Sequence, residues 1–206
     1  NTLALTTPGD GAANGQITVN ATNVSTWSGG TDYPIISYSS FSGTIDDFVL
    51  GTVSGLSPRQ SASLVNTGSA IALHIDGDSI RWTGDASPDW TTTAVGSPFN
   101  WILPSSSSST EYLSGDVVLF DDTATNYSVN IAENVSPGSV VFDNGTDYTF
   151  TSTGGFGITG GSVIKNNSGT VVLATNNTYT GTTTINAGTL QIGNGGASGS
   201  ISASSS

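Results

Sequence analysis

The sequence contains no cysteine and no methionine, and charged residues make up only 9% of its 206 positions. The lack of cysteine excludes a disulfide scaffold and a zinc site built on thiolates. The formal net charge is −12, and only Arg59, Arg81 and Lys165 are positively charged. Nucleic-acid phosphates and anionic lipids attract clustered Lys and Arg, so this composition argues against both as partners. No apolar run approaches the length of a transmembrane helix, so we expect no membrane insertion by this segment.

In place of charge, the chain is rich in Ser, Thr and Asn and has 27 glycines. Helix-forming residues are scarce, and no long stretch shows a helical apolar stripe. β-Branched and aromatic residues are plentiful, and they favour pleated strands. They occur in short alternating runs separated by Gly, Asn, Asp, Ser or Pro, which is typical of all-β proteins. The sequence therefore predicts an all-β fold.

A faint internal repeat runs through the second half of the chain. The segments GDVVL, GSVVF and GSVIK start 23 residues apart, at positions 115, 138 and 161. A period near 20 residues suits one coil of a right-handed parallel β-helix (a β-solenoid), in which each coil stacks on the last. We therefore expect Val117, Val140 and Val163 to form one vertical row inside a narrow core. An antiparallel sandwich with chance Gly-Val-Val segments is the alternative.

The predicted organisation has three parts, and the solenoid pattern is best supported for residues 110–206. Residues 1–80 are a β-rich segment, read either as the end of a preceding repeat unit or as a small sheet packed at one end. Residues 81–110 are rich in Trp, Pro and Ser, and we expect a looped junction with an exposed serine run. Residues 111–206 are predicted to be the parallel β-helix.

Residues 161–196 read GSVIKNNSGTVVLATNNTYTGTTTINAGTLQIGNGG. This stretch resembles the autotransporter-associated β-strand repeat, also called the passenger-associated transport repeat. The matching positions are Lys165, Gly169, Thr170, Leu173, Asn177–Gly181, Thr183, Ile185 and Gly188–Leu190. The departures are Asn167, where the family has a glycine, and residues 174–176. The resemblance implies a parallel β-helical stalk or passenger at a bacterial outer cell surface or outside the cell, with no catalytic residues in the repeat.

Two pairs of carboxylates are candidate ligands for calcium, which takes several oxygen ligands. They are Asp76 with Asp78, and Asp121 with Asp122. Neither pair matches an EF-hand loop or the calcium nonapeptide repeat, and solvated turn residues are the alternative. Calcium is the one cofactor considered, and the predicted fold does not require it.

Three tryptophans, Trp82, Trp90 and Trp101, are candidates for stacking against a glycan. Core packing is the alternative, because most of the aromatic residues considered lie beside Pro and Gly. His74 is the single histidine, and a triad or a histidine–metal cluster lacks the partners it needs. We therefore predict that the protein is not an enzyme.

The predicted function is structural, as a stalk or filament segment of an extracellular surface protein. Unpaired strands at the ends of a solenoid can template further strands, so we expect head-to-tail self-association. The alternatives are a module that binds glycans or host molecules through the three tryptophans, and a calcium-dependent surface-layer module.

Overall fold

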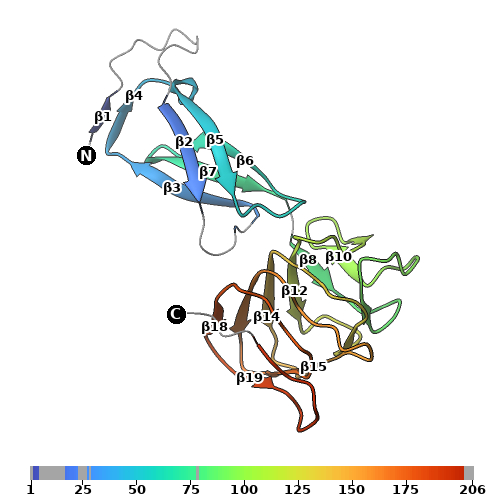
Figure 1. The fold of residues 1–206 in the computed structure, drawn as a ribbon. Coiled ribbons are helices and arrows are strands. Elements are labelled where there is room, and N and C mark those ends of the chain that lie inside the picture. The colour runs from blue at the N-terminus through green and yellow to red at the C-terminus, as the bar shows by residue number, and fades with distance from the viewer. Residues whose placement is uncertain (1, 5–16, 23–26, 28, 78, 202–206) are drawn as a thin grey trace. The chain divides into compact units, whose positions relative to one another are not determined.

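The computed structural model of the protein describes residues 2–4, 17–22, 27, 29–77 and 79–201 (Figure 1). The chain divides into two compact units, Asn1–Gly77 and Asp78–Ser206. The described residues form strands joined by turns, with one short 3-10 turn at Ile45–Asp47 and no α-helix. The predicted all-β class is confirmed.

The described residues of the first unit form three small sheets. Strand β2 (Ile17–Thr22) pairs in parallel with β5 (Phe48–Ser54), and β1 (Thr2–Ala4) pairs in parallel with β4 (Ser40–Ser42). The third sheet is antiparallel, with β7 (Ala70–Asp76) between β3 (Thr31–Ser37) and β6 (Ser61–Asn66). Strand β7 supplies most of the core of this unit, because its residues from Ala70 to Ile75 are buried with the exception of His74.

The second unit is built from two sheets whose strands alternate along the chain (Figure 1). The first sheet has the order β11 (Ser108–Thr110), β10 (Trp101–Leu103), β8 (Ile80–Trp82), β12 (Val117–Asp121), β14 (Ser139–Asp143), β16 (Ser162–Asn166) and β18 (Thr183–Ile185). The second has the order β9 (Asp89–Trp90), β13 (Ser128–Ile131), β15 (Tyr148–Thr151), β17 (Thr170–Leu173) and β19 (Thr189–Ile192). Pairing from β8 to β18 and from β9 to β19 is parallel throughout. The result is a β-solenoid of about three turns in residues 117–192, which confirms the predicted fold.

Side chains at equivalent positions of successive coils form rows inside the solenoid. Val118, Val140 and Val163 are partners on neighbouring strands, and each is 0% exposed. The expected row is therefore present, but the sequence prediction of its first member was wrong, because Val117 pairs with Ser139 instead. The coil from Val118 to Val140 is 22 residues long and the next is 23 (140 − 118 and 163 − 140). Aligning the segments at a constant spacing of 23 therefore misses the register by one residue, which decides which side chain occupies the row.

Residues 81–110 form the first layer of this unit and contain a β-hairpin. Strand β10 runs antiparallel to both β8 and β11, so the direction of the sheet changes at this end. The serine run Ser105–Ser109 lies at the turn and in β11, and it is exposed. The hairpin of residues 101–110, together with Tyr112, is called the aromatic cap below.

Candidate functional site

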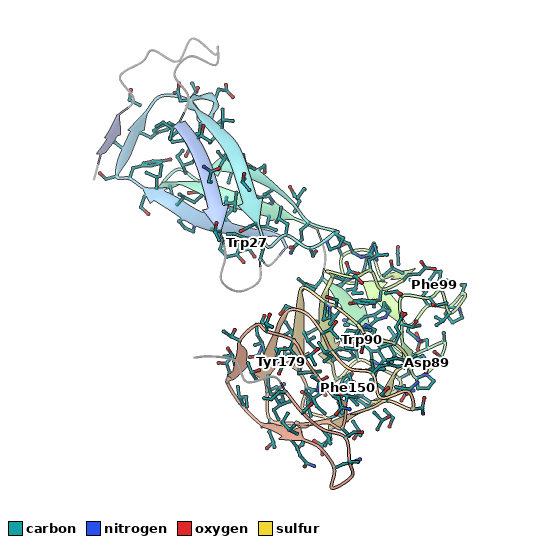
Figure 2. The ribbon with its side chains drawn as sticks, in the orientation of Figure 1. Trp27, Asp89, Trp90, Phe99, Phe150 and Tyr179 are labelled. Atoms are coloured by element: carbon teal, nitrogen blue, oxygen red, sulfur yellow. The ribbon has the colours of Figure 1, made fainter. Side chains whose placement is uncertain are left out.

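The three tryptophans considered for glycan binding are buried in one core cluster, to which the aromatic cap contributes Trp101. Trp82 and Trp90 are 0% exposed and Trp101 is 2% exposed. The ring centroid of Trp101 lies 5.1 Å from that of Trp82 and 5.6 Å from that of Trp90, both edge to face. Phe120 lies 5.4 Å from Trp90 and continues the cluster into the solenoid. Figure 2 shows Trp90 inside the unit. These ring faces are covered by other side chains, so they present no open surface to a sugar.

Asn100 holds the loop before β9 against the aromatic cap. Its side chain is 1% exposed, and its Oδ1 accepts hydrogen bonds from the backbone N–H groups of Ala86 (3.0 Å) and Ser87 (2.9 Å). Its Nδ2 donates to Ser87 Oγ at 3.0 Å and to the Asp89 carbonyl at 2.8 Å. Both polar atoms of this buried amide thus have hydrogen-bond partners, which avoids the cost of burying an unsatisfied polar group. The sequence shows only an Asn–Trp pair here and did not identify this role.

A shallow hollow lies beside the aromatic cap, and its cavity volume of about 10 Å³ is room for about one water molecule. Its lining includes the carboxylates of Asp89 and Glu111 and the side chains of Thr91, Thr93 and Phe99. Figure 2 shows Asp89 and Phe99 on this part of the second unit. Carboxylates, hydroxyls and aromatic rings can contact sugars at a surface, but a cavity of this volume does not enclose a sugar ring. Sequence patterns did not identify the hollow, because its walls come from several separate loops.

Glu133 fixes one wall of this hollow. Its Oε1 accepts hydrogen bonds from Thr91 Oγ1 at 2.8 Å and from Thr92 Oγ1 at 2.6 Å, and from the Thr92 backbone N–H. Hydrogen bonds from Thr92, and then from Thr91, lower the pKa of Glu133 below its ordinary value. The carboxylate is therefore charged at neutral pH, and it ties the loop after β9 to the next coil.

Asp121 and Asp122, considered as calcium ligands, make separate contacts with the chain. Asp121 Oδ1 accepts hydrogen bonds from the Thr123 backbone N–H (2.9 Å) and Oγ1 (2.6 Å). Asp122 accepts hydrogen bonds from the backbone N–H groups of Thr146 (2.7 Å) and Gly145 (2.9 Å) one coil further on. These bonds lower the pKa of Asp122. The two adjacent carboxylates therefore face different partners, and Asp122 links two coils.

Of the other candidate pair, Asp76 lies near the end of the first unit. Asp78 falls outside the described residues. Asp76 Oδ1 lies 3.2 Å from His74 Nε2, and His74 Nδ1 lies 2.6 Å from Asp32 Oδ1 on the neighbouring strand. The hydrogen bond with Asp32 is the main cause that raises the pKa of His74. Within the described residues, no group of three or more His, Cys, Asp and Glu side chains is arranged to hold a metal ion.

The motif Asn177-Thr-Tyr-Thr-Gly181 joins three coils. Asn177 is 1% exposed, and its Oδ1 accepts a hydrogen bond from the Ile158 N–H at 3.0 Å. Its Nδ2 donates to the Ser200 carbonyl at 3.0 Å, 23 residues further along the chain. Tyr179 is 1% exposed, and its hydroxyl lies 2.9 Å from Thr183 Oγ1. Figure 2 shows Tyr179 within the second unit. The motif residues therefore hold the stacked coils together.

Within the described residues, helices offer no means of crossing a membrane, since none is long and apolar enough. This finding concerns helices alone.

Comparison with known proteins gives two matches. The passenger-associated-transport-repeat family matches residues 163–192. The adhesin BmaC autotransporter of Brucella suis biovar 1 (strain 1330) is 40% identical over 87 residues, which are 41% of this chain and 2% of that relative. The chain thus spans a very small part of the relative's length. No solved structure matches the chain.

The stacked coils and the buried motif define an all-β repeat protein of the solenoid class. The family match confirms the transport-repeat motif expected within residues 161–196. Together with the relative it supports an autotransporter passenger repeat protein, located at the bacterial outer surface or outside the cell. The repeat and the solenoid support an extracellular surface passenger segment. The same comparisons suggest a structural or adhesive role rather than an enzymatic one.

Proposed function

We propose that this chain is a non-catalytic spacer in a surface passenger, a length of stalk that holds other parts of the protein away from the cell. The observation that carries this proposal is the continuous parallel ladder from β12 to β18, with its buried rows. Solenoids of this kind bury a core only by stacking neighbouring coils, which gives an extended and stiff body. The links between coils made by Asp122 and Asn177 support the same role.

The test exchanges the segment within the full passenger on cells. Residues 78–206 are replaced by an unrelated solenoid with the same number of coils, and separately they are deleted. A spacer predicts that the exchange keeps binding to host cells and the reach of the passenger tip, whereas the deletion shortens the reach in electron micrographs. Loss of binding in the exchanged passenger, with display at the surface unchanged, would contradict the spacer role.

The second candidate function is adhesion, and the similarity to a relative named an adhesin favours it. The hollow offers carboxylates, hydroxyls and the Phe99 ring. A glycan array with the wild-type chain and the Phe99→Ala variant tests this function. Adhesion through the hollow predicts a glycan signal that Phe99→Ala removes and that Leu113→Ala, at an exposed aliphatic residue outside the lining, keeps.

Head-to-tail self-association is part of the same proposal and has its own measurement. Sedimentation velocity over a range of concentrations distinguishes a chain that associates from one that stays monomeric. Calcium dependence is tested by thermal unfolding with calcium and with chelator. Since Asp121 and Asp122 are already hydrogen-bonded within the chain, we expect the same melting temperature in both.

A further inference from the structure

The outer face of the first solenoid sheet carries a row of aliphatic side chains. Successive side chains of a strand point to opposite faces of the sheet, so the residues next to the buried valine row point outward. On β12, β14 and β16 these are Leu119, Val141 and Ile164, which are strand partners in register and are half-buried. The row continues through Arg81 on β8 to the half-buried Ile102 on β10. These five residues are called the outer row below.

The spacing of the outer row matches one kind of secondary structure better than another. Neighbouring strands are about 4.8 Å apart, so the row from β10 to β16 is about 19 Å long. An amphipathic α-helix repeats its apolar side chains about every 5.4 Å, which drifts by only about 0.6 Å per coil. An extended segment places side chains of one face about 6.8 Å apart and falls out of step after two coils. A helix of about 13 residues therefore covers the row.

An acidic row runs beside the outer row, two residues further along each strand. It consists of Asp121, Asp143 and Asn166, which are also strand partners. Arg81 Nη1 lies 3.7 Å from Asp121 Oδ2 and offsets that charge. Asp143 is exposed, and it acts on Lys165 only through space, since the Lys165 Nζ is bound to two backbone carbonyls. Like charges on opposite residues of a sheet repel each other, so a cation placed beside Asp143 would relieve this pair.

The charge of the whole second unit favours the same kind of partner. Residues 78–206 contain ten Asp and Glu residues and two cations, Arg81 and Lys165. Both cations are already engaged within the chain, Arg81 with Asp121 and Lys165 with backbone carbonyls. Such a surface attracts cationic partners and repels nucleic acid and anionic lipid. The aliphatic stem of Arg81 remains as part of the apolar row, because long charged side chains commonly cover apolar surface with their stems.

We propose that the outer row and the acidic row together bind an amphipathic, cationic α-helix of a partner protein. The aliphatic side of the helix packs on Leu119, Val141 and Ile164, and its Lys and Arg side chains face Asp143. Binding of this kind uses apolar side chains once per helical turn as anchors. The inference goes beyond the spacer role, which needs no ligand, and it gives adhesion a surface other than the hollow.

The test titrates the full chain with two synthetic peptides of about 14 residues, enough to cover the row as a helix. Both peptides contain the same numbers of Leu and Lys. One has the helical period, and the other alternates strictly, which favours a strand. We expect the helical peptide to shift NMR amide signals on β8, β12, β14 and β16. Calorimetry should show about tenfold weaker binding, or more, for the alternating peptide.

Two substitutions remove the two halves of the surface. Val141→Ser interrupts the outer row, and Asp143→Lys reverses the exposed charge beside it. Each should weaken binding of the helical peptide by about tenfold or more. Val172→Ser is the matched control, because Val172 is half-buried on the outer face of the second sheet, between its strand partners Thr149 and Gln191. This control should leave the affinity unchanged.

The outcomes are separable. Equal binding of the two peptides, or equal weakening by Val172→Ser, would overturn the inference, because attraction by net charge alone would then explain the binding. Shifts confined to the hollow or to the first unit would overturn it as well. Melting temperatures report whether each variant folds, and Asp143→Lys decides the question if Val141→Ser does not fold. The exchange of residues 78–206 tests the reach of the passenger and not this surface, so either idea can fail without the other.

Discussion

Lys165 is the strand partner of Phe142, and it occupies the place in the row that Phe120 and Phe142 fill in the two preceding coils. The lysine is 0% exposed, and its Nζ donates hydrogen bonds to the carbonyls of Asn166 (2.5 Å) and Asn167 (2.8 Å). Burial lowers the pKa of Lys165, while nearby carboxylates, Asp143 foremost, oppose this shift. The aromatic row thus ends in a cation that is bound by the backbone of a turn.

Gly188 is required by this arrangement. Its φ is +72°, and a Cβ there would lie 2.4 Å from the Gly169 carbonyl oxygen and 2.8 Å from Lys165 Nζ. Gly188→Ala should therefore destabilise the second unit by about 3 kcal/mol or more, from steric overlap added to the left-handed backbone cost. Gly155→Ala is the control, because Gly155 has φ +76° and nothing within 4 Å. It should cost about 1–2 kcal/mol in urea unfolding. Equal losses for both variants would contradict the overlap argument.

Burial along the Phe120 row predicts a gradient of mutational cost. Phe142 is 0% exposed and lies 5.5 Å from Phe120 and 5.4 Å from Phe150 between ring centroids. Phe142→Ala should cost about 3–5 kcal/mol, from lost burial and the cavity left behind. Ile185 follows Lys165 in the same row and is 52% exposed, so Ile185→Ala should cost less than about 1 kcal/mol. Chemical denaturation measures the loss of unfolding free energy in both variants. Equal losses would contradict the expected gradient.

Asn177→Ala tests the buried link between coils. The substitution leaves the Ile158 N–H and the Ser200 carbonyl without their side-chain partner, so we expect a loss of about 2–4 kcal/mol. Asn194→Ala is the matched control, because the exposed Asn194 accepts a hydrogen bond from nearby Gly196 within the same turn. This control should change stability by less than about 0.5 kcal/mol. Hydrogen exchange at Ile158 reports directly on the lost bond.

Asp122 makes the free energy of unfolding depend on pH in the acidic range. Its pKa is lowered in the folded chain by the N–H groups of Thr146 and Gly145, so the folded state binds fewer protons than the unfolded state near the ordinary pKa of Asp. The contribution is therefore present above that ordinary value and is lost as the pH falls through the lower folded value. In Asp122→Ala, the midpoint of urea denaturation should change less with pH between pH 5 and about pH 2 than it does in the wild type. A slope in Asp122→Ala that matches the wild-type slope would contradict this role of Asp122.

His74 makes the stability of the first unit depend on pH in the opposite direction. Its pKa is raised above 6.5 by Asp32 and Asp76. The contribution of this contact is thus fully present below pH 6.5, and it is lost as the pH rises through the folded pKa. An NMR titration should find the imidazole pKa above 6.5, and Asp32→Asn should lower it more than Asp76→Asn, because the Asp32 hydrogen bond is the largest cause. An unshifted titration in the wild type would contradict the contact.

The sequence predicted the coil and its repeat well, because glycine-bounded Val and Ile recur at nearly constant spacing. It missed the register between β12 and β14, because one coil is a residue shorter than the next and a pattern with a fixed period cannot show this. The packing of the tryptophans depends on β10 reversing direction, a tertiary event with no local signal. The roles of Asn100 and Glu133 were missed for a related reason: each bonds to residues at least ten positions away along the chain.

The hydrogen bonds described above join each coil to its neighbours, so the stability of each coil depends on the coils next to it. The rings of Trp82, Trp90, Trp101 and Tyr112 pack against one another at the first coil. This large buried aromatic surface should make the first coil the slowest part of the second unit to exchange its amide hydrogens.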